Sequence, residues 1–163
     1  MSSYVEAITV VCSDGGEFKI TVTAAKLSKL LNDSLAEDVC VPDDRKIEIT
    51  GGVDSKTLEK VIEYCEKHAP TADSEASDSD GEELKKWDIE FMKMDVEDIL
   101  FHILMAANYL NIKGLLDLAC QTAADLMKGM TVSQIRKIFH IKNDFSSEEH
   151  EELRRQHPGC TFD

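Results

Sequence analysis

The chain has 163 residues, of which 32 are acidic and 18 are basic, and its formal net charge is −14. This length fits one compact domain, or one domain with an appendage. The charge disfavours nucleic acids and anionic membranes as partners, because both are bound through basic surfaces.

The N-terminal third of the chain predicts a small sheet with helices around it. Apolar residues alternate over 8–12 and over 18–22, and the sequence SDGG at 13–16 predicts a hairpin turn between these strands. Ile47 and Ile49 indicate a third strand. Apolar spacing predicts two helices, one with Leu27, Leu30 and Leu31 and one, capped by Asp54, with Leu58, Val61, Ile62 and Cys65. The expected fold class is therefore α+β.

An acidic segment follows at residues 70–86. Residues 70–83 include no basic and no large apolar side chain. Such a segment cannot bury enough surface to offset the entropy lost on ordering, so a disordered loop is expected. It is either an inert acidic spacer or a phosphorylation site, since Ser77 and Ser79 each have an acidic residue three positions later.

Three helices are predicted within residues 98–145, with more apolar residues than one buried face requires. The second of them, which follows Gly114, is apolar almost all round, and the third opens with a capping box formed by Thr131 and Gln134. In the first, three large residues fall outside the core-facing stripe: Phe101, Met105 and Tyr109. Either a larger core of the chain itself or another chain must cover this surplus, and the short length favours another chain.

Two ungapped motifs in this late segment carry a family resemblance. Residues 103–117 read ILMAANYLNIKGLLD, and residues 135–137 and 141–145 read IRK and IKNDF. Weaker matches in family order are SDG at 13–15, VIEYC at 61–65 with His68, and WDIEF at 87–91. Over nearly its whole length, the chain resembles the Skp family, the adaptor subunit of SCF (Skp, cullin, F-box) ubiquitin ligases.

The resemblance implies a BTB/POZ-type fold with a C-terminal helical extension. Residues 1–69 and 87–112 would form the BTB/POZ domain, residues 70–86 the disordered acidic loop, and residues 113–163 the helices that bind F-box proteins. The implied function is a non-catalytic adaptor of an SCF-type cullin-RING E3 ubiquitin ligase, which bridges a cullin N-terminal domain to F-box substrate receptors for ubiquitin-dependent degradation. A RING-box protein would be a partner only indirectly, through the cullin.

The resemblance also assigns two sets of contact residues. The cullin-binding positions are Met105, Asn108 and Tyr109, although Tyr109 could instead be a half-buried core residue. The F-box-binding positions are Leu116, Cys120, Ala123, Met127, Ile135, Ile138, Phe139, Ile141, Asn143 and Phe162. Interfaces that resemble a core cut in half often bury more than about 2,000 Å². The same face could also support a weak homodimer.

Two departures from the family pattern bear on F-box binding. Thr131 is followed by valine and not by the proline of many relatives, so the hydroxylation and glycosylation that some lineages place there are impossible at this position. Gly159 stands at the position of the family's C-terminal tryptophan. Together with Pro158 it should end the helix that starts near Ser146, where Ser146 and Glu149 form a second capping box. Phe162 would replace the aromatic contact from a shifted position, or the contact is lost. A restricted set of F-box partners is therefore expected.

No pattern typical of catalysis or of cofactor binding occurs in the sequence. The five cysteines lack CxxC spacing, and four of them lie in apolar strand or helix contexts: Cys12, Cys40, Cys65 and Cys120. These four are therefore expected to be buried free thiols in a reducing compartment. His157 and Cys160 form an exposed pair near a terminus, where positioning is poor, and together with His150 they lack a fourth metal ligand. We therefore expect no enzyme activity, cofactor or metal. Because neither a signal peptide nor a membrane-spanning apolar run is present, a cytoplasmic and nuclear location is expected.

A second function of a different class stays open at this stage. The same apolar face could serve a structural scaffold, such as a kinetochore or chromosome-associated assembly or a homodimer, without a cullin. Retention of Asn108 and Tyr109 favours the adaptor, because a purely structural protein would not need a cullin surface.

Overall fold

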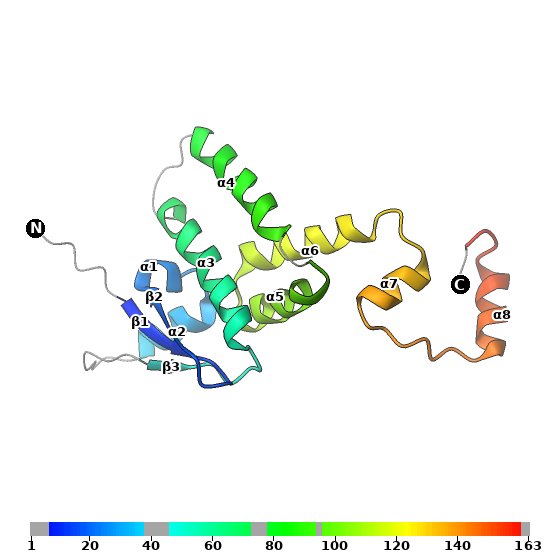
Figure 1. Ribbon diagram of the computed structural model, residues 1–163, viewed down its shortest axis with the longest axis horizontal. Helices are drawn as coiled ribbons and strands as arrows, with labels where there is room; N and C mark the ends of the chain where they lie inside the picture. Colours follow the sequence, from blue (N-terminus) through cyan, green and yellow to red (C-terminus); the bar gives the residue numbers. More distant parts are fainter. Residues whose placement is uncertain (1–6, 38–45, 73–77, 94–95, 161–163) are drawn as a thin grey trace, which may run out of the picture. The chain divides into compact units, whose positions relative to one another are not determined.

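The computed structural model describes residues 7–37, 46–72, 78–93 and 96–160 (Figure 1). Three residues that the sequence analysis singled out lie outside these ranges: Cys40, Ser77 and Phe162.

The chain separates into two compact units, residues 1–120 and residues 121–163. The division falls inside helix α6, Lys113–Met127, and not at its start. Leu115 and Ala119 in the first half of this helix are fully buried, which explains why that half belongs to the first unit.

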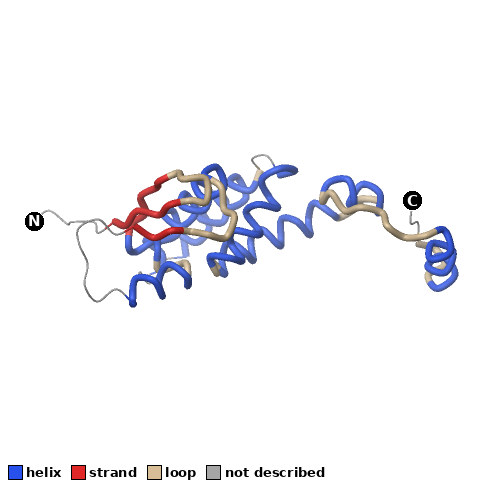
Figure 2. Tube along the Cα trace, turned by 90° about the horizontal axis from the view of Figure 1, so that it is seen from below, coloured by secondary structure: helices blue, strands red, loops and turns tan. Residues whose placement is uncertain are grey.

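The first unit contains the predicted three-stranded sheet, whose strands lie side by side in Figure 2. Strand β1 (Ala7–Val11) lies between β2 (Glu17–Thr21) and β3 (Lys46–Glu48), antiparallel to β2 and parallel to β3. The predicted hairpin is confirmed: Cys12 N–H donates to Gly16 C=O over 2.8 Å, and Gly15 has the positive φ of 86° that glycine tolerates best.

Helices surround this sheet. They are α1 (Val22–Ala25), α2 (Lys29–Glu37), α3 (Ser55–Ala72), α4 (Asp78–Met92), α5 (Val96–Leu110) and the first half of α6. Helix α3 contacts β2, α1 and α5, so it is central to the unit. The largest fully buried apolar side chains come from strands and helices together: Ile8, Val10, Ile20, Ile49, Leu58, Leu110 and Leu115. The α+β class is confirmed.

Polar contacts fix the ends of these elements. The carboxylate of Asp14, in the hairpin turn, accepts from Ser55 N–H over 2.9 Å and from Ser55 Oγ over 2.8 Å, which joins the turn to the start of α3. Asp54 accepts from Thr57 N–H over 2.8 Å, so the predicted cap of this helix is confirmed. These hydrogen bonds favour the ionised carboxylates and lower the pKa of both aspartates.

Helix α4 occupies part of the segment in which the sequence predicted a disordered loop. Residues 70–72 end α3 and residues 78–86 begin α4, so in the described part of 70–86 the chain is helical. The C-terminal half of α4 packs on α3, because the Trp87 ring meets that of His68 at a centroid distance of 5.9 Å and the Phe91 ring lies 6.1 Å from that of Tyr64. A helix extends cooperatively from an anchored end, which explains how the acidic residues at the start of α4 become helical.

A partly buried polar pair joins α4 to α3. Asp88 Oδ1 lies 3.1 Å from His68 Nε2, while His68 Nδ1 lies 2.9 Å from Tyr64 C=O. The ring of His68 also stacks on Tyr64, with centroids 3.8 Å apart. Burial, opposed only in part by His68, raises the pKa of Asp88.

The second unit contains the rest of α6 with two short helices, α7 (Val132–Ile138) and α8 (Ser147–Gln156). Both predicted capping boxes are confirmed, since Thr131 pairs with Gln134 and Ser146 with Glu149. Helix α8 ends before Gly159, as predicted. Within the described ranges, the chain forms no helix with both the length and the apolar character needed to cross a membrane.

Candidate protein interaction sites

The three predicted cullin contacts lie together on α5. Met105 is 56% exposed, Asn108 is exposed and Tyr109 is half-buried. With Gly51 and other neighbours, they line a cavity of about 220 Å³ in the first unit. The spacing of the three residues, one helical turn or less apart, explains why they share a surface.

The ring of Tyr109 lies on the backbone of Gly51. A Cβ atom placed on Gly51 would be 2.5 Å from Tyr109 Cε2 and Cζ, so no side chain fits there unless the ring moves. Tyr109 Oη lies 3.4 Å from Thr50 Oγ1. Tyr109 is thus a half-buried side chain held along one side by the loop before α3, and its assignment as a cullin contact stays a prediction.

Two neighbours on α5 belong to the same surface but were absent from the predicted set. Phe101 is 54% exposed, and its ring meets that of His102 edge-on at a centroid distance of 6.3 Å. His102 also lines the cavity beside Tyr109. The sequence held a signal for Phe101, because it falls outside the buried stripe of the helix.

The predicted F-box contacts begin on α6. Leu116, Cys120, Ala123 and Met127 are spaced four, three and four residues apart, so they follow one face of the helix. Leu116 is half-buried, Cys120 is exposed and Ala123 is buried. Met127 is 36% exposed.

Further along, the predicted apolar contacts of the second unit are only partly covered. Ile135, Ile138 and Phe139 are half-buried, Ile141 is 53% exposed and Asn143 is exposed. Neither α7 nor α8 has a single buried side chain, and in the described part of residues 121–163 the only buried residue is Ala123. As far as residue 160, where the description of the chain ends, the second unit therefore lacks a hydrophobic core of its own.

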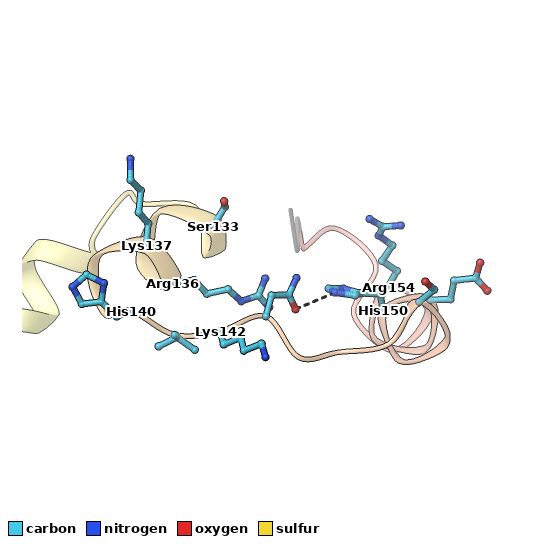
Figure 3. Close-up of a pocket in the computed structure, with 11 residues that line it drawn as sticks. Ser133, Arg136, Lys137, His140, Lys142, His150 and Arg154 are labelled. Atoms are coloured by element: carbon cyan, nitrogen blue, oxygen red, sulfur yellow. Dashed lines mark hydrogen bonds between the residues drawn. The ribbon is translucent and has the colours of Figure 1, made fainter.

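Phe145 is an exposed aromatic that was not in the predicted contact set. It is 46% exposed and meets the ring of His150 edge-on at 5.7 Å. His150 Nε2 lies 3.3 Å from Asn143 Oδ1, drawn as the dashed line in Figure 3. This contact fixes Asn143, one of the predicted F-box contacts, against α8.

The same unit contains an open cavity of about 850 Å³ between α7 and α8 (Figure 3). Four cationic residues line it, Arg136, Lys137, Lys142 and Arg154, together with one carboxylate, Glu151. The cavity is therefore basic, although the chain as a whole is acidic.

The thiols differ from the expectation in one respect. Cys12 and Cys65 are buried, and burial raises the pKa of Cys65 to about 12, so this thiol is unreactive at neutral pH. Cys120 was also expected to be buried, and this is wrong: it is exposed. The reason is that α6 is apolar on more than one side, so its pattern does not indicate which face is covered. Among the described residues, no group of three or more His, Cys, Asp and Glu could hold a metal ion.

Comparison with known proteins decides the family. Residues 6–70 match the profile described as Skp1 family, tetramerisation domain, and residues 113–160 match the profile described as Skp1 family, dimerisation domain. The chain is 48% identical to SKP1-like protein 1 of rice (Oryza sativa subsp. japonica), with 91% of each chain covered. It is 46% identical to SKP1-like protein 1A of Arabidopsis thaliana, with 91% of this chain and 93% of the relative covered.

The chain belongs to the Skp1 family.

Family membership confirms two expectations. The small sheet with its helices is the Skp1-family POZ domain, so the BTB/POZ-type fold is confirmed. Membership of the Skp1 family also supports, in general terms, an adaptor role in SCF ubiquitin ligases, with cullins and F-box proteins as the kinds of partner. The assignment of individual residues to these partners stays a prediction.

Proposed function

We propose that this Skp1-family protein is a non-catalytic adaptor that bridges a cullin N-terminal domain to F-box substrate receptors. The observation that carries the proposal is the absence of a core among residues 121–160 of the second unit, where α7 and α8 are helices without one buried side chain. Isolated helices of 7 and 10 residues are too short to be stable in water without packing. A partner that covers their apolar residues would supply the missing packing.

The F-box face would consist of one side of α6 and the apolar residues that follow it. Met127, Ile141 and Phe145 present large exposed apolar surface, which monomeric proteins usually keep small. Helices of an F-box would interleave with these residues, so that each chain completes the core of the other. Leu116 and Phe139, both half-buried, would be contacts whose remaining surface the partner covers.

The cullin face would be on α5 in the first unit. Tyr109 offers a large ring held by Gly51 and a hydroxyl group near Thr50, which is the combination of apolar area and polar tip typical of interface hot spots. Met105 adds an adaptable apolar contact, and Asn108 adds an exposed amide.

The adaptor would act by positioning alone. A receptor held on the second unit and a cullin held on the first raise the effective concentration of substrate near the cullin-borne RING-box subunit. We propose the cytoplasm and the nucleus as its location.

A second candidate is a homodimer or structural scaffold that uses the same C-terminal face without a cullin. The match of residues 113–160 to a dimerisation domain favours it as the competitor to test. A dimer or scaffold would cover the same apolar residues, but it would give Met105, Asn108 and Tyr109 no role in binding.

The test is co-purification of the full chain with a cullin N-terminal domain and a panel of F-box proteins. The double variant Asn108→Ala, Tyr109→Ala is expected to lose the cullin and keep the F-box protein. Phe139→Ala is the reciprocal control, expected to weaken the F-box protein and keep the cullin. If the wild-type chain binds F-box proteins or itself but no cullin, the bridging role is refuted and the scaffold becomes the favoured function.

A further inference from the structure

We infer that the cavity between α7 and α8 selects F-box partners that insert an acidic segment, with carboxylates placed beside an apolar side chain. This inference rests on the proposed function and adds to it the chemistry of the partner. It identifies a determinant of specificity in the basic residues of the cavity, which are not among the predicted apolar contacts.

The local charge is the first argument. The chain has nearly two acidic residues for each basic one, yet residues 131–145 contain three basic residues and one acidic residue. All three basic residues, Arg136, Lys137 and Lys142, line the cavity. A region that reverses the sign of the surrounding field attracts acidic groups and repels basic ones.

The second argument is that the cations of the cavity lack ion pairs of the kind seen elsewhere in the unit. Lys128 and Arg155, elsewhere in the same unit, are paired with Asp125 and with Glu152 three residues away. In the described part of the chain, Arg136, Lys137 and Lys142 form no such ion pair with a carboxylate of their own chain. Their charges are therefore available to a partner.

The third argument is the geometry of the cavity. Arg136 extends from α7 toward α8, while Lys137 points away from α8 (Figure 3). Arg136, Lys142 and Arg154 therefore reach the cavity from α7, from the connecting segment and from α8. Ile141, 53% exposed, lines the same cavity next to Lys142.

These features together describe the occupant. A volume of about 850 Å³ admits several side chains, which is more than one small ion needs. Arg136 can bind a carboxylate in bidentate fashion, and an apolar side chain of the same segment can cover Ile141. An acidic stretch with one apolar residue meets both requirements, whereas a basic or wholly apolar segment would leave the cations desolvated and unpaired.

The experiment measures the affinity of the full chain for an F-box protein by calorimetry, at about 0.1 M and at about 1 M salt, since exposed charge pairs are screened over this range. The test variant is Arg136→Glu, Lys142→Glu. The matched control is Lys128→Glu, Arg155→Glu, which makes the same change in net charge within the same unit but outside the cavity. Circular dichroism checks that both variants keep their helices, and Arg136→Gln, Lys142→Gln repeats the test without adding negative charge.

At low salt, the test variant is expected to bind at least about ten-fold more weakly than wild type and the control within about two-fold, because only the cavity charges contact the partner. High salt should weaken the wild type and leave the Gln variant almost unchanged. Replacing the partner's acidic residues with lysine should restore binding to the Glu variant. Equal losses in the two charge-reversal variants, or a wild-type affinity that does not depend on salt, would overturn the inference while the adaptor role stands. Failure of the wild type to bind any F-box protein would refute both the inference and the proposed adaptor role.

Discussion

Gly51 offers the sharpest test of the cullin face, because replacing it acts on Tyr109 without changing Tyr109 itself. Gly51 does not have the positive φ that only glycine adopts easily, so Gly51→Ala should not strain the backbone. The new Cβ would stand 2.5 Å from the Tyr109 ring, well inside the separation of about 3.5–4.0 Å that carbon atoms prefer. The ring must therefore move.

The size of the effect follows from the role proposed for Tyr109. A displaced hot-spot aromatic costs about 2 kcal/mol of binding free energy, which is about a 30-fold loss of affinity for the cullin N-terminal domain. Titration calorimetry measures this loss directly. Affinity for an F-box protein, measured on the same sample, should stay unchanged because Gly51 belongs to the other unit.

Gly52→Ala is the matched control in the same loop. Gly52 has a φ of +73° and no atom within 4 Å of an added Cβ, so this variant strains the backbone by about 1–2 kcal/mol but leaves Tyr109 in place. Gly52→Ala should therefore have the lower melting temperature of the two variants, and Gly51→Ala should have the lower affinity for the cullin. Normal cullin binding by Gly51→Ala, or an equal loss in Gly52→Ala, would refute the reasoning.

Three further predictions concern other parts of the molecule. Phe139→Ala should cost roughly 2 kcal/mol or more of F-box affinity, measured by calorimetry, and unchanged binding would move the site elsewhere. Ser28→Ala should lower the free energy of unfolding in urea by about 1–3 kcal/mol, since fully buried Ser28 Oγ donates to Leu110 C=O over 2.6 Å and accepts from Leu31 N–H. No loss would show that water replaces the hydroxyl. For Asp88, the pKa is raised above the ordinary 3.8, so the protonated form is favoured in the folded state and ionisation lowers stability as pH rises. The unfolding free energy of Asp88→Asn should therefore increase relative to wild type from pH 3.5 upward, whereas a difference that is constant with pH would contradict this.

Local signals predicted much of the fold. The hairpin at 13–16, the cap at Asp54 and the two capping boxes at Thr131 and Ser146 depend on neighbours within a few residues, and all are present. Periodicity also indicated that Met105 and Tyr109 face away from the stripe of α5.

Contacts between distant parts of the sequence could not be predicted from local patterns. Helix α4 packs on α3 through Trp87 and Phe91, whose rings meet those of His68 and Tyr64, and through Asp88 beside His68, which no pattern within residues 70–86 reveals. The contact between Gly51 and Tyr109 joins a loop to a helix far along the chain.

A different reason explains why the sequence did not predict the exposure of Cys120. A helix with apolar residues almost all round does not show which of its faces is covered until its neighbours are known. The sequence did not predict the basic cavity, because Arg136, Lys142 and Arg154 are separate in the sequence and meet only in the folded second unit.

The central claim is that the second unit is half of a core which an F-box protein completes. Amide hydrogen exchange of residues 121–160, in the full chain alone and in complex with an F-box protein, tests this claim most directly. The account predicts fast exchange in α7 and α8 of the free chain, strong protection in the complex, and no such protection when the cullin domain alone is added. Strong protection of α7 and α8 in the monomeric free chain would contradict it.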